Sequence, residues 1–189
     1  LSGLVGSEMC IRDRYKICHL DCVSLVLRDH SHTDFCIGAA PSGLTPICDF
    51  LHEEYNLLSL VTVRHPLDSF LSLVSQGWHK QFSPCSLDEY SIRYLAFLDR
   101  YRDLPLMRYE AFCASPHSFM RQLCDLLDLE YEPAFMARFG CYQLSGDSGR
   151  SSSLEIKIRP RRSVPADIHR EIELSPHYFQ LLERLGYPS

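Results

Sequence analysis

The segment 57–72 constrains the fold of this chain more than any other, because it joins a buried strand to a sharp turn and a helix. It begins with the apolar run LLSLVTV, which has no helical period and is typical of a strand buried on both faces of a parallel sheet. Pro66 ends this strand because it has no N–H to donate, and Asp68 is placed to cap the helix that follows. The segment therefore predicts a strand, a turn and a helix of an α/β fold.

The turn in this segment offers groups that suit a phosphate. In open parallel sheets, ligands bind at the carboxyl ends of the strands. That end would present the guanidinium of Arg64, the N-terminus of the helix and, just inside the helix, the hydroxyl of Ser72. The alternative is a solvated arginine and a serine that faces the helix surface.

The order of Arg64, Pro66 and Ser72, R-x-P-x-x-x-x-x-S after an apolar strand, resembles a segment of the sulfotransferases that use 3′-phosphoadenosine 5′-phosphosulfate (PAPS). In that family the segment binds the 3′-phosphate of the cofactor. The resemblance implies this role for Arg64 and Ser72, and the rest of the chain supplies the context that so short a motif requires.

A second apolar run, residues 23–27, predicts another buried strand, next to the first, that leads into Arg28 and His30. It resembles the K-x-H segment of the family, with Arg28 in place of the lysine, which implies that His30 is the general base. A histidine suits this work because its unperturbed pKa is about 6.5. His32 is a rival for the role, and an ordinary surface loop is the alternative.

A third short strand is predicted at residues 105–110. Its end resembles the family segment R-Y-E-D-L, which implies that Tyr109 lies against the nucleotide. Ala111 departs from that pattern, because it stands in place of the acid.

Further helices are predicted from their caps and from apolar spacing. Ser86 and Glu89 form an S-x-x-E capping box for a helix with an aromatic stripe, which is more typical of a core than of a base-stacking surface. Serine followed by proline opens two more helices, at residues 116–127 and 176–185, and Gly186 ends the second.

Basic residues concentrate late in the chain, after the segment LSGDSGR at residues 144–150. Its glycines permit positive φ, which lets backbone amides turn toward an anion. The segment and the RPRR that follows resemble a region of bacterial sulfotransferase-like proteins. This implies a lid over the 3′-phosphate made by Ser148, Gly149 and Arg150, whereas a flexible linker is the alternative.

Composition excludes several classes of protein. With 189 residues, 46% of them hydrophobic, the chain predicts one globular domain, and its net charge of −5 gives no nucleic-acid signal. No run approaches the roughly 18 apolar residues of a membrane helix. Nine cysteines without a C-x-x-C pair favour reduced thiols, hence a cytoplasmic protein without a metal site.

Residues 4–14, LVGSEMCIRDR, resemble a translated adapter of transposase-based sequencing libraries. We therefore expect residues 1–14 to be a non-native segment and residues 15–189 to be the C-terminal portion of a sulfotransferase domain. A native, irregular N-terminus is the alternative. The P-loop-like G-x-P-R/K-S-G-T-T segment, which the family carries on its first strand, has no counterpart in this chain.

The resemblance spans about residues 23–187 and implies a P-loop-like sulfotransferase fold, with a mostly parallel sheet flanked by helices and without its first strand and P-loop. The activity implied is transfer of a sulfuryl group from PAPS to a hydroxyl or amine of a small-molecule or carbohydrate acceptor. This chain itself is expected to be inactive. The alternative is a non-catalytic relative that binds a nucleotide or phosphate. The sequence predicts neither the acceptor nor the oligomeric state.

Overall fold

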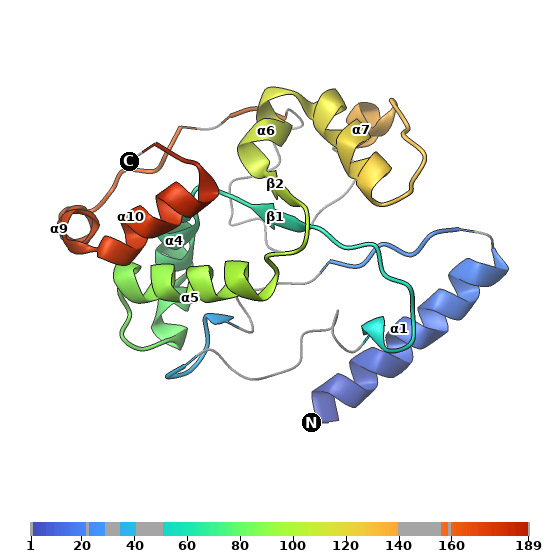
Figure 1. Cartoon of the computed structure of the whole chain (residues 1–189), viewed down its shortest axis with the longest axis horizontal. Helices are drawn as coiled ribbons and strands as arrows, with labels where there is room; N and C mark the ends of the chain where they lie inside the picture. The colour runs from blue at the N-terminus through green and yellow to red at the C-terminus, as the bar shows by residue number, and fades with distance from the viewer. Residues whose placement is uncertain are drawn as a thin grey trace.

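A short parallel sheet lies near the middle of the computed structural model, with helices around it (Figure 1). The structure describes residues 2–21, 23–28, 35–40, 51–139, 156–158 and 160–188, and of residues 2–10 it describes the backbone alone. The elements follow in the order α1 (Ser2–Leu20), β1 (Val61–Val63), α4 (Pro66–Gln76), the 3₁₀ helix η1 (Trp78–Gln81), α5 (Leu87–Arg100), β2 (Leu106–Arg108), α6 (Tyr109–Ala114), α7 (Pro116–Leu126), α8 (Phe135–Arg138), α9 (Ala166–Leu174) and α10 (Pro176–Leu185). The predicted α/β class is confirmed in this short sheet flanked by helices.

β1 and β2 pair in parallel, with Val61 opposite Leu106 and Val63 opposite Arg108. The side chains of β1 alternate, because Val61 and Val63 are buried whereas Thr62 between them is exposed. Since the two strands run in the same direction, their carboxyl ends meet at one edge of the sheet. The residues that follow each strand are therefore neighbours in space.

The buried face of β1 packs against two helices. Its two valines form a cluster with Phe97 and Leu98 of α5 and with Leu181 and Leu185 of α10. A second cluster joins α4, α5 and α10, and its buried members include Leu67, Phe70, Leu71, Leu73, Leu87, Tyr90, Tyr178 and Leu182. These helices lie together to one side of the strands (Figure 1). The aromatic stripe of α5 is therefore part of the core, as predicted.

The predicted ends of α5 and α10 are confirmed. The Ser86 hydroxyl accepts a hydrogen bond from the Glu89 amide at 3.2 Å, and the Ser175 hydroxyl accepts one from the Tyr178 amide at 3.0 Å. α10 ends where Gly186 takes a left-handed conformation with φ of 67°. Such caps act within one turn of helix, so a local sequence signal is enough to predict them.

The prediction of a buried strand at residues 23–27 is wrong. The segment has no regular structure, and Val23, Val26 and Leu27 are 56%, 63% and 45% exposed. A strand forms only where a second backbone supplies its hydrogen bonds, and the described partner of β1 is β2. An apolar run alone does not predict whether another strand is available to pair with it.

The prediction that residues 58–63 form a strand buried on both faces is also wrong. Only Val61–Val63 is a strand, and Leu58 before it is 53% exposed. The helices α5 and α10 cover one face of β1, which accounts for the alternation of buried and exposed side chains.

Residues 4–14 lie within α1. In this helix Arg12 forms an ion pair with Glu54, and the centre of the Tyr15 ring lies 4.6 Å from the centre of the Tyr55 ring. Their non-native origin stays a prediction. α1 has 19 residues, yet neither it nor any other helix in the described part of the chain is long and apolar enough to cross a membrane.

Candidate functional site at the carboxyl ends of the strands

Arg64 and Tyr109 meet where the two strands end. Each is the first residue after its strand, and the register that places Val63 opposite Arg108 places them side by side. The Arg64 guanidinium carbon lies 5.4 Å from the centre of the Tyr109 ring, within the range of a cation–π contact. Tyr109 is 41% exposed. The structure therefore brings together the arginine and tyrosine that the sequence assigned to one cofactor.

The guanidinium of Arg64 has spare hydrogen-bonding capacity. Its Nε atom is buried and has no hydrogen-bond partner among the described residues. Leaving a buried donor unsatisfied costs about 1–3 kcal/mol, so most such atoms in folded proteins have an acceptor. An anionic ligand would supply the missing acceptor, since an arginine pairs well with phosphate oxygens.

His65 and Glu110, which follow Arg64 and Tyr109, are joined by a hydrogen bond. The backbone amide of His65 donates a hydrogen bond to Oε1 of Glu110 at 2.9 Å. The hydroxyl of Tyr94, from α5, donates to the backbone carbonyl of Arg64 at 3.4 Å. The backbone of Arg64 is thus held by a bond to its own carbonyl and by another to the amide that follows.

His65, rather than Asp68, caps α4. The Nδ1 atom of His65 accepts a hydrogen bond from the Leu67 amide at 3.3 Å. The prediction for Asp68 is wrong because a cap must precede the first helical residue, Pro66, and Asp68 lies inside the first turn. Burial and, after it, the positive charge of Arg161 lower the pKa of His65. The neutral ring that results can accept the bond from the helix.

Asp68 instead binds Arg161. Its carboxylate lies 3.0 Å from Nε of that arginine, and the Asp68 side chain is only 17% exposed. A carboxylate in the first turn also suits the helix dipole, so the N-terminus of α4 already holds a negative charge. This negative charge would oppose a phosphate at the same helix end.

Ser72 lies one turn after Asp68, so both are on the polar side of α4. Its carbonyl accepts a hydrogen bond from the Ser75 hydroxyl at 2.8 Å. Within the described ranges, no hydrogen bond joins the Ser72 hydroxyl to Arg64. The predicted convergence of these two side chains stays a prediction.

The remaining predicted site residues, His30, Ser148, Gly149 and Arg150, lie outside the described residues. Of the basic segment that follows them, Arg161 is seen at the N-terminus of α4. Sequence reasoning missed His65 and Glu110 as structural parts of the site. The pattern R-Y-E, which ends in Glu110, was the available signal.

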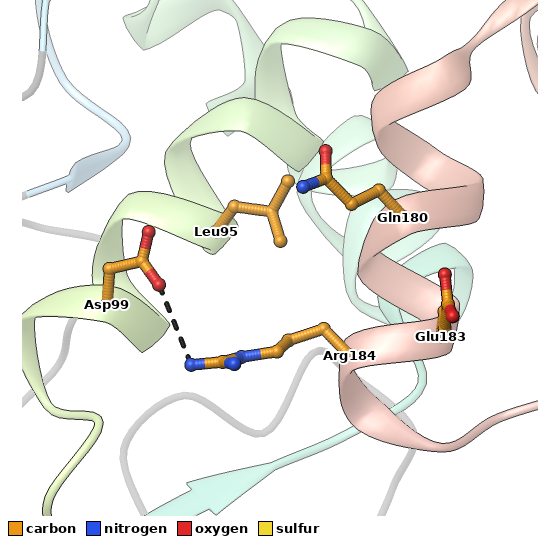
Figure 2. A pocket seen from close by; sticks show the side chains of 5 residues that line it. All are labelled: Leu95, Asp99, Gln180, Glu183 and Arg184. Atoms are coloured by element: carbon orange, nitrogen blue, oxygen red, sulfur yellow. Dashed lines mark ion pairs between the residues drawn. The ribbon is translucent and has the colours of Figure 1, made fainter.

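A hollow between α5 and α10 is a separate feature (Figure 2). An ion pair crosses it, with Nη2 of Arg184 3.6 Å from Oδ1 of Asp99. These charges neutralise each other, and the hollow includes none of the predicted site residues. Its lining consists of Leu95, Asp99, Gln180, Glu183 and Arg184. We therefore do not assign a ligand to it.

Metal ligands are not clustered in the described part of the molecule. No group of three or more histidine, cysteine, aspartate or glutamate side chains there could hold an ion.

Known proteins were compared with the chain by sequence and by structure. No family model and no curated protein matches it. Among solved structures, a sulfotransferase domain from the curacin biosynthetic pathway is similar over 67% of this chain, with 19% sequence identity and a TM-score of 0.38. The chain spans about half, 52%, of the length of that domain. So low a TM-score does not establish a common fold.

Proposed function

We propose that this chain is a sulfotransferase-like protein with a P-loop-like fold, in which Arg64 binds the 3′-phosphate of PAPS. One observation carries the proposal: the Arg64 guanidinium lies over the Tyr109 ring at the strand ends and has a buried Nε without an acceptor among the described residues. The motif R-x-P-x-x-x-x-x-S, which begins at Arg64, supports the same assignment.

The residues at the strand ends fit the charged and aromatic parts of such a nucleotide. Arg64 offers a positive charge, and the half-exposed ring of Tyr109 offers an aromatic surface. Two carboxylates lie nearby, but Asp68 is paired with Arg161 and Glu110 accepts the bond from the His65 amide. Because these carboxylates are engaged elsewhere, Arg64 remains available to an anion.

In an active enzyme of this kind, bound PAPS would supply the sulfuryl group for transfer to a hydroxyl or amine of a small-molecule or carbohydrate acceptor, whereas this chain itself is expected to be inactive. His30 would take the proton from that acceptor as general base. Ser72, Ser148, Gly149 and Arg150 would bind the 3′-phosphate together with Arg64. These roles rest on the sequence resemblance alone.

Nucleotide binding tests the proposal directly. We expect the chain to bind 3′-phosphoadenosine 5′-phosphate more tightly than adenosine 5′-phosphate, which lacks the 3′-phosphate. Arg64→Ala should weaken binding of the first nucleotide by about 10- to 150-fold, since a charge-assisted hydrogen bond contributes about 1.5–3 kcal/mol. Binding of the second nucleotide should change little. Isothermal titration calorimetry measures both.

Arg121→Ala is a matched control. Arg121 also lies over a tyrosine, with its guanidinium carbon 5.0 Å from the ring of Tyr131, but it belongs to α7. We expect no change in the affinity for either nucleotide. Equal affinities of the wild-type chain for the two nucleotides, or an unchanged affinity in the Arg64→Ala variant, would contradict the proposed function.

A further inference from the structure

Tyr187 reaches the candidate site from the far end of the chain. It follows Gly186, whose left-handed conformation ends α10 and turns the backbone. The Tyr187 amide donates a hydrogen bond to the carbonyl of Leu182 at 2.9 Å. The turn places the centre of the Tyr187 ring 4.8 Å from the centre of the His65 ring. The C-terminal helix therefore delivers an aromatic side chain to the strand ends.

The hydroxyl of Tyr187 completes a chain of hydrogen bonds. It donates to Oε2 of Glu110 at 2.7 Å, while Oε1 of the same carboxylate accepts the amide of His65 at 2.9 Å. Burial and the bond to Glu110 raise the pKa of Tyr187, so the hydroxyl remains protonated and continues to donate. Both oxygens of Glu110 are thus used, and they connect Tyr187 to the residue that follows Arg64.

The ring of Tyr187 also contacts Arg108. The Arg108 guanidinium carbon lies 5.3 Å from the ring centre, and Nη1 donates to the carbonyl of Gly186 at 3.1 Å. Arg108 is the last residue of β2, so it is fixed by the sheet. Because the ring contacts both His65 and Arg108, the hydroxyl has a defined direction toward Glu110.

We propose that Tyr187 is a positioning residue for the Arg64 site: through Glu110 it fixes the backbone of His65 and thereby the direction in which Arg64 leaves β1. The connection between Tyr187 and His65 is a property of the fold. Its effect on nucleotide affinity rests on the proposed function.

Tyr187→Phe in the full chain is the test, because it removes the hydroxyl and keeps the ring against His65 and Arg108. We expect the His65 amide to exchange its hydrogen with solvent about fivefold faster or more, as the loss of about 1 kcal/mol would cause. Exchange followed by nuclear magnetic resonance measures this without any nucleotide. The amide of Val61, which donates to Pro105 at 2.8 Å, is the internal control. A purely global loss of stability would accelerate both amides.

Tyr131→Phe is the matched control variant. It also removes a tyrosine hydroxyl with a hydrogen bond, at 2.6 Å to Nδ1 of His117. We expect exchange at His65 to be unchanged. In a Glu110→Ala background, Tyr187→Phe should alter exchange at His65 by less than about twofold, because the connecting carboxylate is gone.

Nucleotide affinity supplies the second measurement. Tyr187→Phe should weaken binding of 3′-phosphoadenosine 5′-phosphate by about three- to tenfold, and Tyr131→Phe should leave it unchanged. Unchanged exchange at His65 overturns the inference. Faster exchange with undiminished affinity, in a protein that binds the nucleotide, overturns the positioning role. Failure of the proposed function is seen separately, in a wild-type chain that does not distinguish the two nucleotides.

Discussion

Gly186 and Arg108 are in direct contact, so closely that a Cβ atom built at residue 186 would lie 2.7 Å from Nη2 of the arginine. Gly186 also has a φ of 67°, in the left-handed region that side chains disfavour. The contact joins the end of α10 to the end of β2. The backbone conformation therefore favours glycine at this position, and a side chain there would also displace the end of the Arg108 side chain.

Gly186→Ala should lower the free energy of unfolding by more than Gly77→Ala does. Gly77 has a similar φ of 73° but no atom within 4 Å of its Cβ position, so its replacement isolates the backbone cost of about 1–2 kcal/mol. At residue 186 the displaced Arg108 adds to that cost. Urea denaturation of the two variants measures the difference, and equal losses would show that the contact with Arg108 is easily relieved.

Arg93 is completely buried and joins α5 to the segment 35–38. Its guanidinium donates to the carbonyls of Phe35 and Gly38, each at 2.9 Å, and to Oε1 of Glu89 at 2.7 Å. Arg93→Met should lower the free energy of unfolding by about 3 kcal/mol, because it leaves a carboxylate and carbonyls without their donor. Thermal or urea denaturation checks this value.

The exposed ion pair of Arg184 and Asp99 is the comparison for Arg93. Its atoms are 3.6 Å apart, with the two side chains 50% and 73% exposed. Arg184→Ala should cost less than about 1 kcal/mol, since water screens such pairs. Equal losses of unfolding free energy in the Arg93→Met and Arg184→Ala variants would show that burial does not determine the contribution of Arg93 to stability.

The carboxylate of Asp88 makes the free energy of unfolding depend on pH in the acid range. Burial tends to raise its pKa, but hydrogen bonds from Ser175 and His177, at 2.6 and 3.0 Å, outweigh burial, and the pKa lies below 3.8. The carboxylate therefore stabilises the fold above pH 3.8, and this contribution is lost as the pH falls through the lower folded pKa.

Asp88→Asn should therefore destabilise the protein most near neutral pH and progressively less below pH 3.8. The measurement is the free energy of unfolding of both proteins from pH 6 to about pH 2.5. Asp103→Asn, at a side chain 93% exposed, is the control. A difference between wild type and Asp88→Asn that stays constant over this range would show that the charge of Asp88 does not contribute.

Cys36 should be an unreactive thiol. It is 6% exposed, and burial raises its pKa to about 11. The thiolate is the reactive form, so at pH 8 we expect Cys36 to be alkylated by iodoacetamide at least about tenfold more slowly than the exposed Cys85. Peptide mass spectrometry after timed alkylation measures the two rates. Equal rates would show that the segment around Cys36 opens readily.

The sequence predicted a strand at residues 58–63, a turn and a helix. The order of these elements is confirmed, but the strand is shorter, Val61–Val63, and is followed by α4. Arg64 and Tyr109 could also be assigned together, because each lies at the end of a predicted strand. The residue that caps α4 could not be predicted from the sequence. His65 and Asp68 both have side chains that can accept a hydrogen bond, and only the position of the first helical residue decides between them.

Local interactions explain what the sequence by itself determined: the caps at Ser86 and Ser175 and the glycine that ends α10 act within a turn of backbone. The tertiary structure alone decided that β2 pairs with β1, that residues 23–27 remain exposed, and that Tyr187 reaches Glu110. These outcomes depend on contacts between residues up to 77 positions apart. An apolar run or a single tyrosine carries no information about such a distant partner, because the partner is fixed only when the helices and strands pack together.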